Sequence, residues 1–150
     1  MRAILFRAKR QEPVDEGNGV WCYGDIVHMP NNQIMLANPR YWDYLDIMES
    51  PADPLSEAFF GMVDPETVGQ FTGIYDKRGT KVFEGDRCRV ERPCVIEYGE
   101  ITFNNGCFWF DTKGVSGMMR LCDVVPNGFE IEVIGNIHEK TEGGDQDGRT

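Results

Sequence analysis

The chain has 150 residues, and its 15 Lys and Arg against 25 Asp and Glu give a formal net charge of −10 at pH 7. This length suits about one domain, which buries roughly two-thirds of its unfolded surface without disulfide or metal support. The acidic balance opposes binding to phosphate backbones and anionic membranes, and no apolar stretch is long enough for a membrane span. The 17 glycines and the aromatic content of 11% favour a turn-rich β protein.

The first 30 residues predict an N-terminal β-hairpin. Apolar and polar residues alternate over residues 3–10, and β-forming residues fill 20–29 with an interruption at Gly24. A polar loop separates the two strands, so we expect them to pair. Trp21 and Tyr23 share one face of the second strand, and an aromatic pair at that spacing is typical of a packing anchor in a core.

An irregular segment follows over residues 30–61, where four prolines leave no room for a long helix. Two short helices, at 41–48 and 56–60, fit the apolar spacing, and a strand through 34–36 fits equally well. The apolar end of this segment, Phe59 to Val63, is expected to dock against a barrel or to cover a subunit contact.

The stretch from residue 62 to residue 90 has the clearest local structure. Asp64 caps one helical turn that begins at Pro65. A hairpin follows, with a type I turn that places Gly79 in the left-handed conformation. Its strands cover 70–75 and 81–83, and Glu84-Gly85-Asp86 then breaks the chain before a strand at 87–90 in which Cys88 and Val90 share one face.

The rest of the chain predicts further strands and a polar tail. Asn105-Gly106 is the signature of a type I′ hairpin turn, and Gly135 is expected to bend the closing strand. The tail is Gly-rich and is expected to be disordered. The predicted strands cover 94–98, 101–103, 107–111, 118–125 and 129–137, and the tail covers 141–150.

Five segments carry a resemblance to a known family. They are ILFRAKR, WCYGDIVH, VDPETVGQFTG, DKRGTKVFEGD and EVIGNIHE, and they occur in the family's order. The chain resembles the YopX family of phage and prophage proteins. The resemblance implies a bacterial or phage cytoplasmic protein whose C-terminal part is similar to an SH3-type barrel. It brings no catalytic or binding residue to this chain.

The cysteines and histidines form no recognisable site. The five cysteines are Cys22, Cys88, Cys94, Cys107 and Cys122, and they contain no C-x-x-C pair. We expect no metal site or disulfide framework, and we expect the cysteines that alternate with or adjoin apolar strand positions (Cys88, Cys107 and Cys122) to pack in the core. No motif links His28 or His138 to a cysteine as a base would require.

Two acidic residues, Glu84 and Asp86, bracket Gly85 and could form an acid and base pair or a metal site. Turn formation is the favoured interpretation, because Gly-Asp before an alternating strand is a common turn arrangement. The acidic residues at 64 and 66 are explained by helix capping. A phosphate-binding loop of the G-x-x-x-x-G-K-[ST] type is absent.

Basic residues cluster twice, close to aromatic side chains. We expect solvated faces here, because the total charge opposes a nucleic-acid role. The clusters are Arg2, Arg7, Lys9 and Arg10, and then Lys77, Arg78 and Lys81, with Phe6, Phe71 and Phe83 nearby.

The predicted organisation is mainly β. Residues 1–61 form the N-terminal hairpin and the irregular connection, residues 62–140 form the SH3-like barrel, and residues 141–150 form the tail. The predicted function is that of a cytoplasmic, non-enzymatic phage or prophage accessory module that binds a host or phage protein and forms a homo-oligomer. No catalytic, cofactor or metal residue is assigned. The alternatives are a nucleic-acid-associated phage protein, with steep salt dependence, and a small enzyme that uses a carboxylate or a cysteine.

Overall fold

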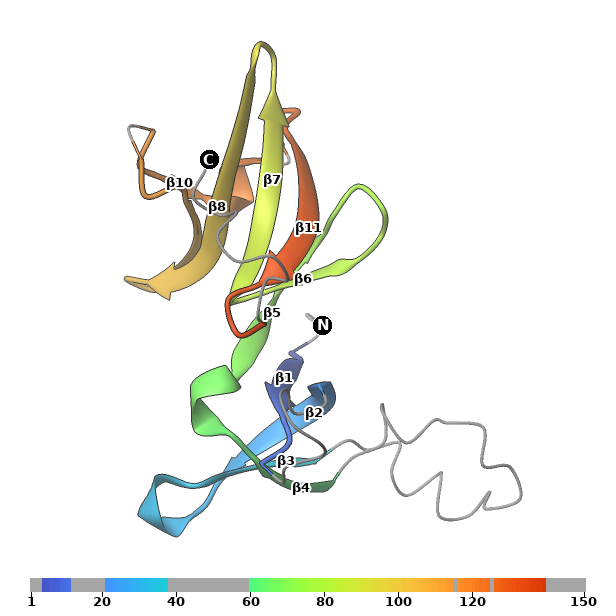
Figure 1. Ribbon diagram of the computed structural model, residues 1–150, viewed down its shortest axis with the longest axis vertical. Helices are drawn as coiled ribbons and strands as arrows, with labels where there is room; N and C mark the ends of the chain where they lie inside the picture. The colour runs from blue at the N-terminus through green and yellow to red at the C-terminus, as the bar shows by residue number, and fades with distance from the viewer. Residues whose placement is uncertain (1–3, 12–20, 38–59, 115, 125, 140–150) are drawn as a thin grey trace, which may run out of the picture. The chain divides into compact units, whose positions relative to one another are not determined.

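The computed structural model describes residues 4–11, 21–37, 60–114, 116–124 and 126–139 (Figure 1). These residues form two antiparallel sheets and one short helix, which confirms the mainly β prediction, and no closed barrel is detected among them. The chain divides into two compact units, Met1–Phe71 and Thr72–Thr150. The expected boundary between residues 61 and 62 therefore lies within a strand of the first unit. The predicted tail lies outside the described residues.

The first unit contains four strands and the start of a fifth, in the hydrogen-bonded order β4-β3-β2-β1-β5. Its elements are β1 (Phe6–Lys9), β2 (Trp21–His28), the 3-10 turn η1 (Pro30–Asn32), β3 (Ile34–Ala37), β4 (Phe60–Val63), the 3-10 turn η2 (Pro65–Thr67) and β5 (Gly69–Tyr75). The expected strand at 34–36 is confirmed as β3. The two short helices expected at 41–48 and 56–60 lie outside the described residues, except for Phe60, which begins β4.

The predicted N-terminal hairpin is confirmed by antiparallel pairing of β1 with β2, from Phe6 opposite Gly24 to Lys9 opposite Trp21. From Asp25 onward β2 pairs with β3 instead. The sequence interruption at Gly24 thus marks the point at which one continuous strand changes its partner.

The core of the first unit takes one fully buried residue from each of four strands: Ala8, Cys22, Leu36 and Val63. The end of β1 returns to β4 through a bridge between Arg10 and Val63. The strands of this unit therefore wrap around a small apolar centre.

The prediction that Trp21 and Tyr23 form the core is wrong. The residue between them, Cys22, points into the core, and side chains alternate between the two faces of a strand. Trp21 is half-buried on the opposite face, where it packs against basic side chains of β1. The residue that sequence reasoning missed is Cys22, which alternates with the two aromatic residues and is fully buried.

The capped turn at η2 is confirmed. The Asp64 side chain accepts a hydrogen bond from the Glu66 amide (3.1 Å). The buried Thr67 hydroxyl donates to the Asp64 carbonyl (2.7 Å) and accepts from the Lys9 amide (2.8 Å). The turn is thus tied to β1 just before β5 begins.

The second unit is built on a five-stranded sheet in the order β10-β9-β8-β7-β11, and the end of β5 forms a hairpin with β6. Its elements are β6 (Lys81–Phe83), β7 (Asp86–Arg92), β8 (Val95–Asn104), β9 (Cys107–Asp111), β10 (Met118–Arg120), α2 (Leu121–Val124) and β11 (Glu130–Asn136). Both predicted hairpin turns are confirmed. Gly79 has φ +83 and donates its amide to the Asp76 carbonyl, and Asn105 and Gly106 both have positive φ as a type I′ turn requires.

Two strand predictions need correction. The strands predicted at 94–98 and 101–103 are one ten-residue strand, β8, which begins at Val95 and leaves Cys94 in the preceding turn. Gly99 continues this strand at a point where the backbone of Asp111 leaves no space for a Cβ atom. The strand predicted over 118–125 ends at Arg120 and becomes the helical turn α2. That turn places Leu121 and Val124, three residues apart, together in the core.

The predicted bend at Gly135 is confirmed by a register shift between Val133 and Gly135.

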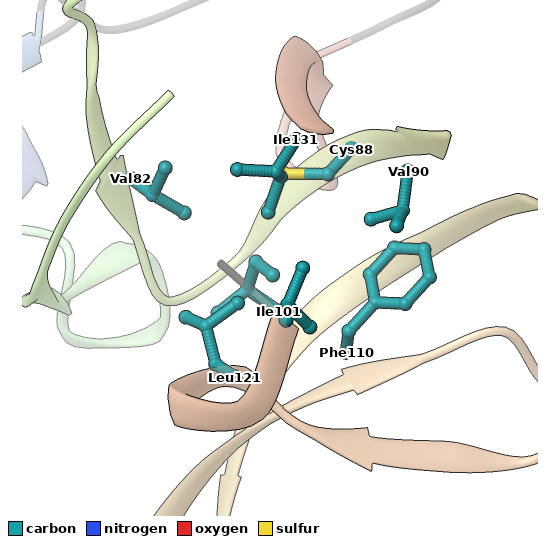
Figure 2. Packing of buried hydrophobic residues seen from close by; sticks show 8 residues of the cluster. Val82, Cys88, Val90, Ile101, Phe110, Leu121 and Ile131 are labelled. Carbon is teal, nitrogen blue, oxygen red and sulfur yellow. The ribbon is translucent and has the colours of Figure 1, made fainter. Parts of the chain in front are cut away.

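The core of the second unit lies on one face of the five-stranded sheet, and Figure 2 shows its packing. Cys88 and Val90 both point into it, as predicted from their alternation. The buried members are Val82, Cys88, Val90, Ile101, Phe110, Leu121, Val124 and Ile131. Val82 of β6 joins this cluster, so the hairpin belongs to the same unit as the sheet.

Candidate binding face

The second face of the five-stranded sheet is the candidate functional surface, and we call it the outer face. Cys88 and Ile101 point into the core, so the residues that alternate with them in register lie on the opposite side. The outer face is made of Arg87, Arg89 and Glu91 on β7, Ile96, Tyr98, Glu100 and Thr102 on β8, Trp109 and Asp111 on β9, Met118 and Arg120 on β10, and Glu130 and Glu132 on β11.

Three large apolar side chains of the outer face are exposed. Ile96 is 48%, Tyr98 56% and Met118 42% accessible to solvent. Trp109 is half-buried on the same face, and its indole nitrogen donates to the Asn104 carbonyl at 2.9 Å. Aromatic residues and methionine are enriched where proteins bind other proteins. The outer face therefore exposes residue types that are common in such surfaces.

The charged groups of this face pair with one another. Arg89 lies opposite Tyr98 in the register and donates to Glu91 at 3.1 Å. The hydrogen bond to Glu91 raises the pKa of Arg89, burial opposes that shift, and a hydrogen bond to Tyr98 adds to it. Arg89 thus stays charged beside the Tyr98 ring. Glu100 is paired with Lys113 at 3.0 Å.

The acidic pair predicted to form a turn behaves as one. Asp86 is fully buried and accepts a hydrogen bond from the Phe83 amide at 2.8 Å and one from the Asn136 side chain at 3.4 Å. Gly85 has φ +91, a left-handed conformation that glycine adopts without steric cost. Asp86 therefore joins the start of β7 to the end of β11.

Sequence reasoning missed the wider role of Asp76. Its buried carboxylate accepts backbone hydrogen bonds from Arg78 (2.9 Å), Thr80 (2.8 Å) and Val133 (3.0 Å). Burial raises the pKa of Asp76, but the bonds from Val133, Thr80 and Arg78, with the Arg78 charge, outweigh it and leave the pKa below its ordinary value. The Lys77 amide also donates to the Ile131 carbonyl at 3.0 Å. Two hydrogen bonds, at Ile131 and Val133, therefore join the hairpin turn to β11.

The cysteines divide by burial. Cys22 and Cys88 are buried, and Cys107 is half-buried. Cys94 and Cys122 are exposed, so the core position expected for Cys122 is wrong, because α2 turns this residue outward. Burial raises the pKa of the Cys22 thiol, and a hydrogen bond from Arg10 at 3.3 Å opposes that shift.

No metal site emerges from the parts of the chain that the structure describes. Within them, no group of three or more His, Cys, Asp or Glu side chains could hold a metal ion. The two histidines lie in different units, His28 at the end of β2 and His138 after β11, and the structure brings neither of them to an assigned site.

The first basic cluster is not a solvated face, and that expectation is wrong for two of its members. Arg7 and Lys9 are only 8% and 6% exposed. Their charged groups lie 4.6 and 5.1 Å from the centre of the Trp21 ring, within the range of cation–π attraction. Arg2 lies outside the described residues. The positive charges of Arg7 and Lys9 therefore lie against the Trp21 ring.

The second basic cluster is engaged within its own unit. Lys77 and Arg78 both pair with Glu132, Lys77 at 3.2 Å. Lys81 lies 5.6 Å from the centre of the Tyr75 ring. The two clusters fall in separate units, and each has partners inside the protein.

Comparison with known proteins identifies one family. The family model described as YopX protein matches residues 48–142, which is more than half of the chain and includes the whole outer face. No curated protein and no solved structure matches the chain. Among the described residues, no helix is long and apolar enough to cross a membrane.

Proposed function

Because the chain belongs to the YopX family, we propose that it is a phage or prophage accessory protein that acts by binding another protein through the outer face. The observation that carries this proposal is the exposure of Ile96, Tyr98 and Met118 on one face of one sheet. Large apolar side chains exposed on one face of a sheet are typical of a surface that a partner covers. The partner is a host or phage protein, or a second copy of this chain in a homo-oligomer.

Binding through the outer face requires no catalytic residue, cofactor or metal ion, so the proposed role is non-enzymatic. The polar residues of this face pair with one another, as Arg89 and Glu91 do. Such groups suit the polar rim of an interface better than proton transfer. We place this activity in the cytoplasm.

We also propose that the second unit is related to an SH3-type barrel, as the family resemblance implies. The bonds from Asp76 to Val133 and from Lys77 to Ile131 support this, because they join the β5–β6 hairpin to the edge of the five-stranded sheet. The shared core, which Val82 enters from β6, also supports it. An experimental structure in which the hairpin lies away from β11 would contradict the relationship.

The binding proposal is tested by site-specific photo-crosslinking in the host cell. A photoreactive phenylalanine at position 98 is expected to give one discrete protein adduct, because the Tyr98 ring lies at the centre of the proposed contact. The same residue at position 66, which is exposed in the first unit, is the control and should not give that adduct. Adding Ile96→Ser should weaken the adduct at position 98 without unfolding the protein.

Two outcomes contradict the proposal. One is the absence of a discrete adduct at position 98 while the protein is folded and abundant. The other is the same adduct at positions 98 and 66, which would show contact without preference for the outer face. An adduct of twice the mass of the chain would identify the partner as a second copy.

A further inference from the structure

The outer face contains a pair of like charges in direct opposition. Glu91 of β7 lies opposite Glu130 of β11 in the strand register, and Ile96 of β8 lies opposite Glu91 on its other side. Like charges directly opposite each other in a sheet are destabilising. The row of three residues therefore places two adjacent carboxylates beside an exposed apolar side chain.

Nearby cations neutralise the negative charges of Glu91 and Glu130 only in part. Glu91 is paired with Arg89 at 3.1 Å, and it remains 45% exposed. Among the described residues, no cation lies within ion-pair distance of Glu130. In the neighbouring row, by contrast, Glu132 is bound by both Lys77 and Arg78. The negative charge at Glu91 and Glu130 is therefore less neutralised than that at Glu132, so an added cation gains more there.

We propose that the outer face takes a basic segment of a protein partner, whose apolar side chains cover Ile96 and Tyr98 and whose Lys or Arg side chains lie at Glu91 and Glu130. This inference rests on the proposed function and adds the chemical class of the partner. The net charge of −10 favours it, because a long-range negative field speeds the approach of a cationic partner and slows that of an anionic one.

Three labelled peptides of equal length serve as probes in anisotropy titrations against the full chain. The first is built of Lys and Leu, the second of Ser and Leu, and the third of Glu and Leu. The Lys peptide is expected to bind most tightly, with an affinity that falls as salt rises. Removing both carboxylates with Glu91→Gln and Glu130→Gln should weaken it about fivefold, as expected for two exposed ion pairs.

The matched control removes the same number of charges elsewhere. Asp25→Asn and Glu66→Gln change exposed carboxylates of the first unit, so the net charge shifts equally while the outer face is intact. This control should leave the affinity for the Lys peptide within a factor of about two, because neither side chain belongs to the outer face. An equal loss in both double variants would overturn the inference, since it would show attraction to the total charge alone.

The peptides also separate this inference from the proposed function. The Ser peptide could bind as tightly as the Lys peptide, with both affinities lowered by substitution of Ile96 and Tyr98. That result would disprove a basic partner but would support the outer face as the binding surface. If substitution of Ile96 and Tyr98 by Ser leaves the binding of every peptide unchanged in a folded protein, both proposals fail.

Thermal unfolding of the Glu130→Gln variant provides a second measurement that needs no partner. Removing one of two opposed carboxylates should raise the melting temperature by about 1–3 °C at low salt, and the difference should shrink as salt rises. An unchanged or lower melting temperature at low salt would show that the pair is already compensated and would overturn the inference.

Discussion

At the scale of single residues, two buried carboxylates tie distant parts of the second unit together. Asp76 and Asp86 each bond to backbone amides and to residues about fifty positions away in the sequence, so each closes a large loop of chain. A buried carboxylate that accepts several backbone hydrogen bonds is held in its ionised form. Asp76 therefore links the β5–β6 hairpin to β11, and Asp86 links the start of β7 to β11.

Replacing Asp76 by Asn is expected to destabilise the protein by about 1–3 kcal/mol at neutral pH, since hydrogen bonds to a charged acceptor are lost. The lowered pKa of Asp76 sets the pH dependence. Its stabilising contribution is complete above its unfolded pKa of about 3.9 and is lost as the pH falls through the lower, folded pKa. Denaturant titrations at several pH values should show that the variant loses less stability than the parent between about pH 5 and about pH 2.

The control for this titration is Asp25→Asn, which removes an exposed carboxylate from β2. Its stability should follow that of the parent chain at every pH. Parallel curves for the parent and the Asp76→Asn variant would contradict the assignment of Asp76 as a carboxylate stabilised in its ionised form.

Gly99 is expected to tolerate no side chain. A Cβ atom at this position would lie 2.5 Å from the Asp111 carbonyl oxygen, and backbone cannot move aside cheaply in the middle of a sheet. Gly99→Ala should therefore cost about 1–3 kcal/mol, measured by urea denaturation. Gly114→Ala is the matched control, because its Cβ would meet its nearest neighbour at an ordinary 3.8 Å. Equal stability of the two variants would contradict the close approach of Asp111 to β8.

At the scale of elements, local sequence patterns predicted turns better than strand lengths. The turn at Asn105-Gly106 and the cap at Asp64 depend on two to four neighbouring residues, and both were predicted correctly. The length of β8 and the helical turn α2 depend on distant contacts. Glycine at position 99 resembles a turn residue until the approach of Asp111 is known, and the burial of Leu121 and Val124 decides the conformation after β10.

The hairpin turn at residues 76–79 gives a test of backbone conformation alone. Gly79 has φ +83, and no atom lies within 4 Å of the position that a Cβ would take. Gly79→Val should cost about 1–3 kcal/mol through the left-handed backbone of a β-branched residue. Gly79→Asn should cost clearly less, because asparagine tolerates this region. Melting temperatures that do not separate the two variants would contradict the turn conformation.

At the scale of the whole molecule, the sequence correctly predicted a mainly β protein, but it did not show which residues form the exposed and buried surfaces. The net charge and the scarcity of catalytic motifs pointed to binding. The outer face did not emerge from sequence reasoning, because the side of β8 that faces the core is decided by packing of Ile101 against distant residues such as Val90 and Phe110. The buried state of Arg7 and Lys9 was equally hidden, since it depends on how Trp21 packs across the hairpin.

The full chain is expected to show no detectable affinity for random duplex or single-stranded nucleic acid at physiological salt. Its charge of −10 repels phosphate, Arg7 and Lys9 pack on Trp21, and Lys77 pairs with Glu132. Anisotropy titrations at low and physiological salt measure this affinity directly. Sub-micromolar binding that weakens steeply with salt would replace protein binding by a nucleic-acid role.

The bonds from Asp76 and Lys77 to β11 also govern how the five-stranded sheet can grow. Main-chain groups at the edge of a sheet are a template on which a further strand can add, and two of those groups on β11 are already occupied from within the chain. The opposite edge, β10, is only three residues long. Each edge of this sheet is therefore a poor template for a further strand, β11 because two of its main-chain groups are occupied and β10 because it is short, and this protects the sheet from edge-to-edge aggregation.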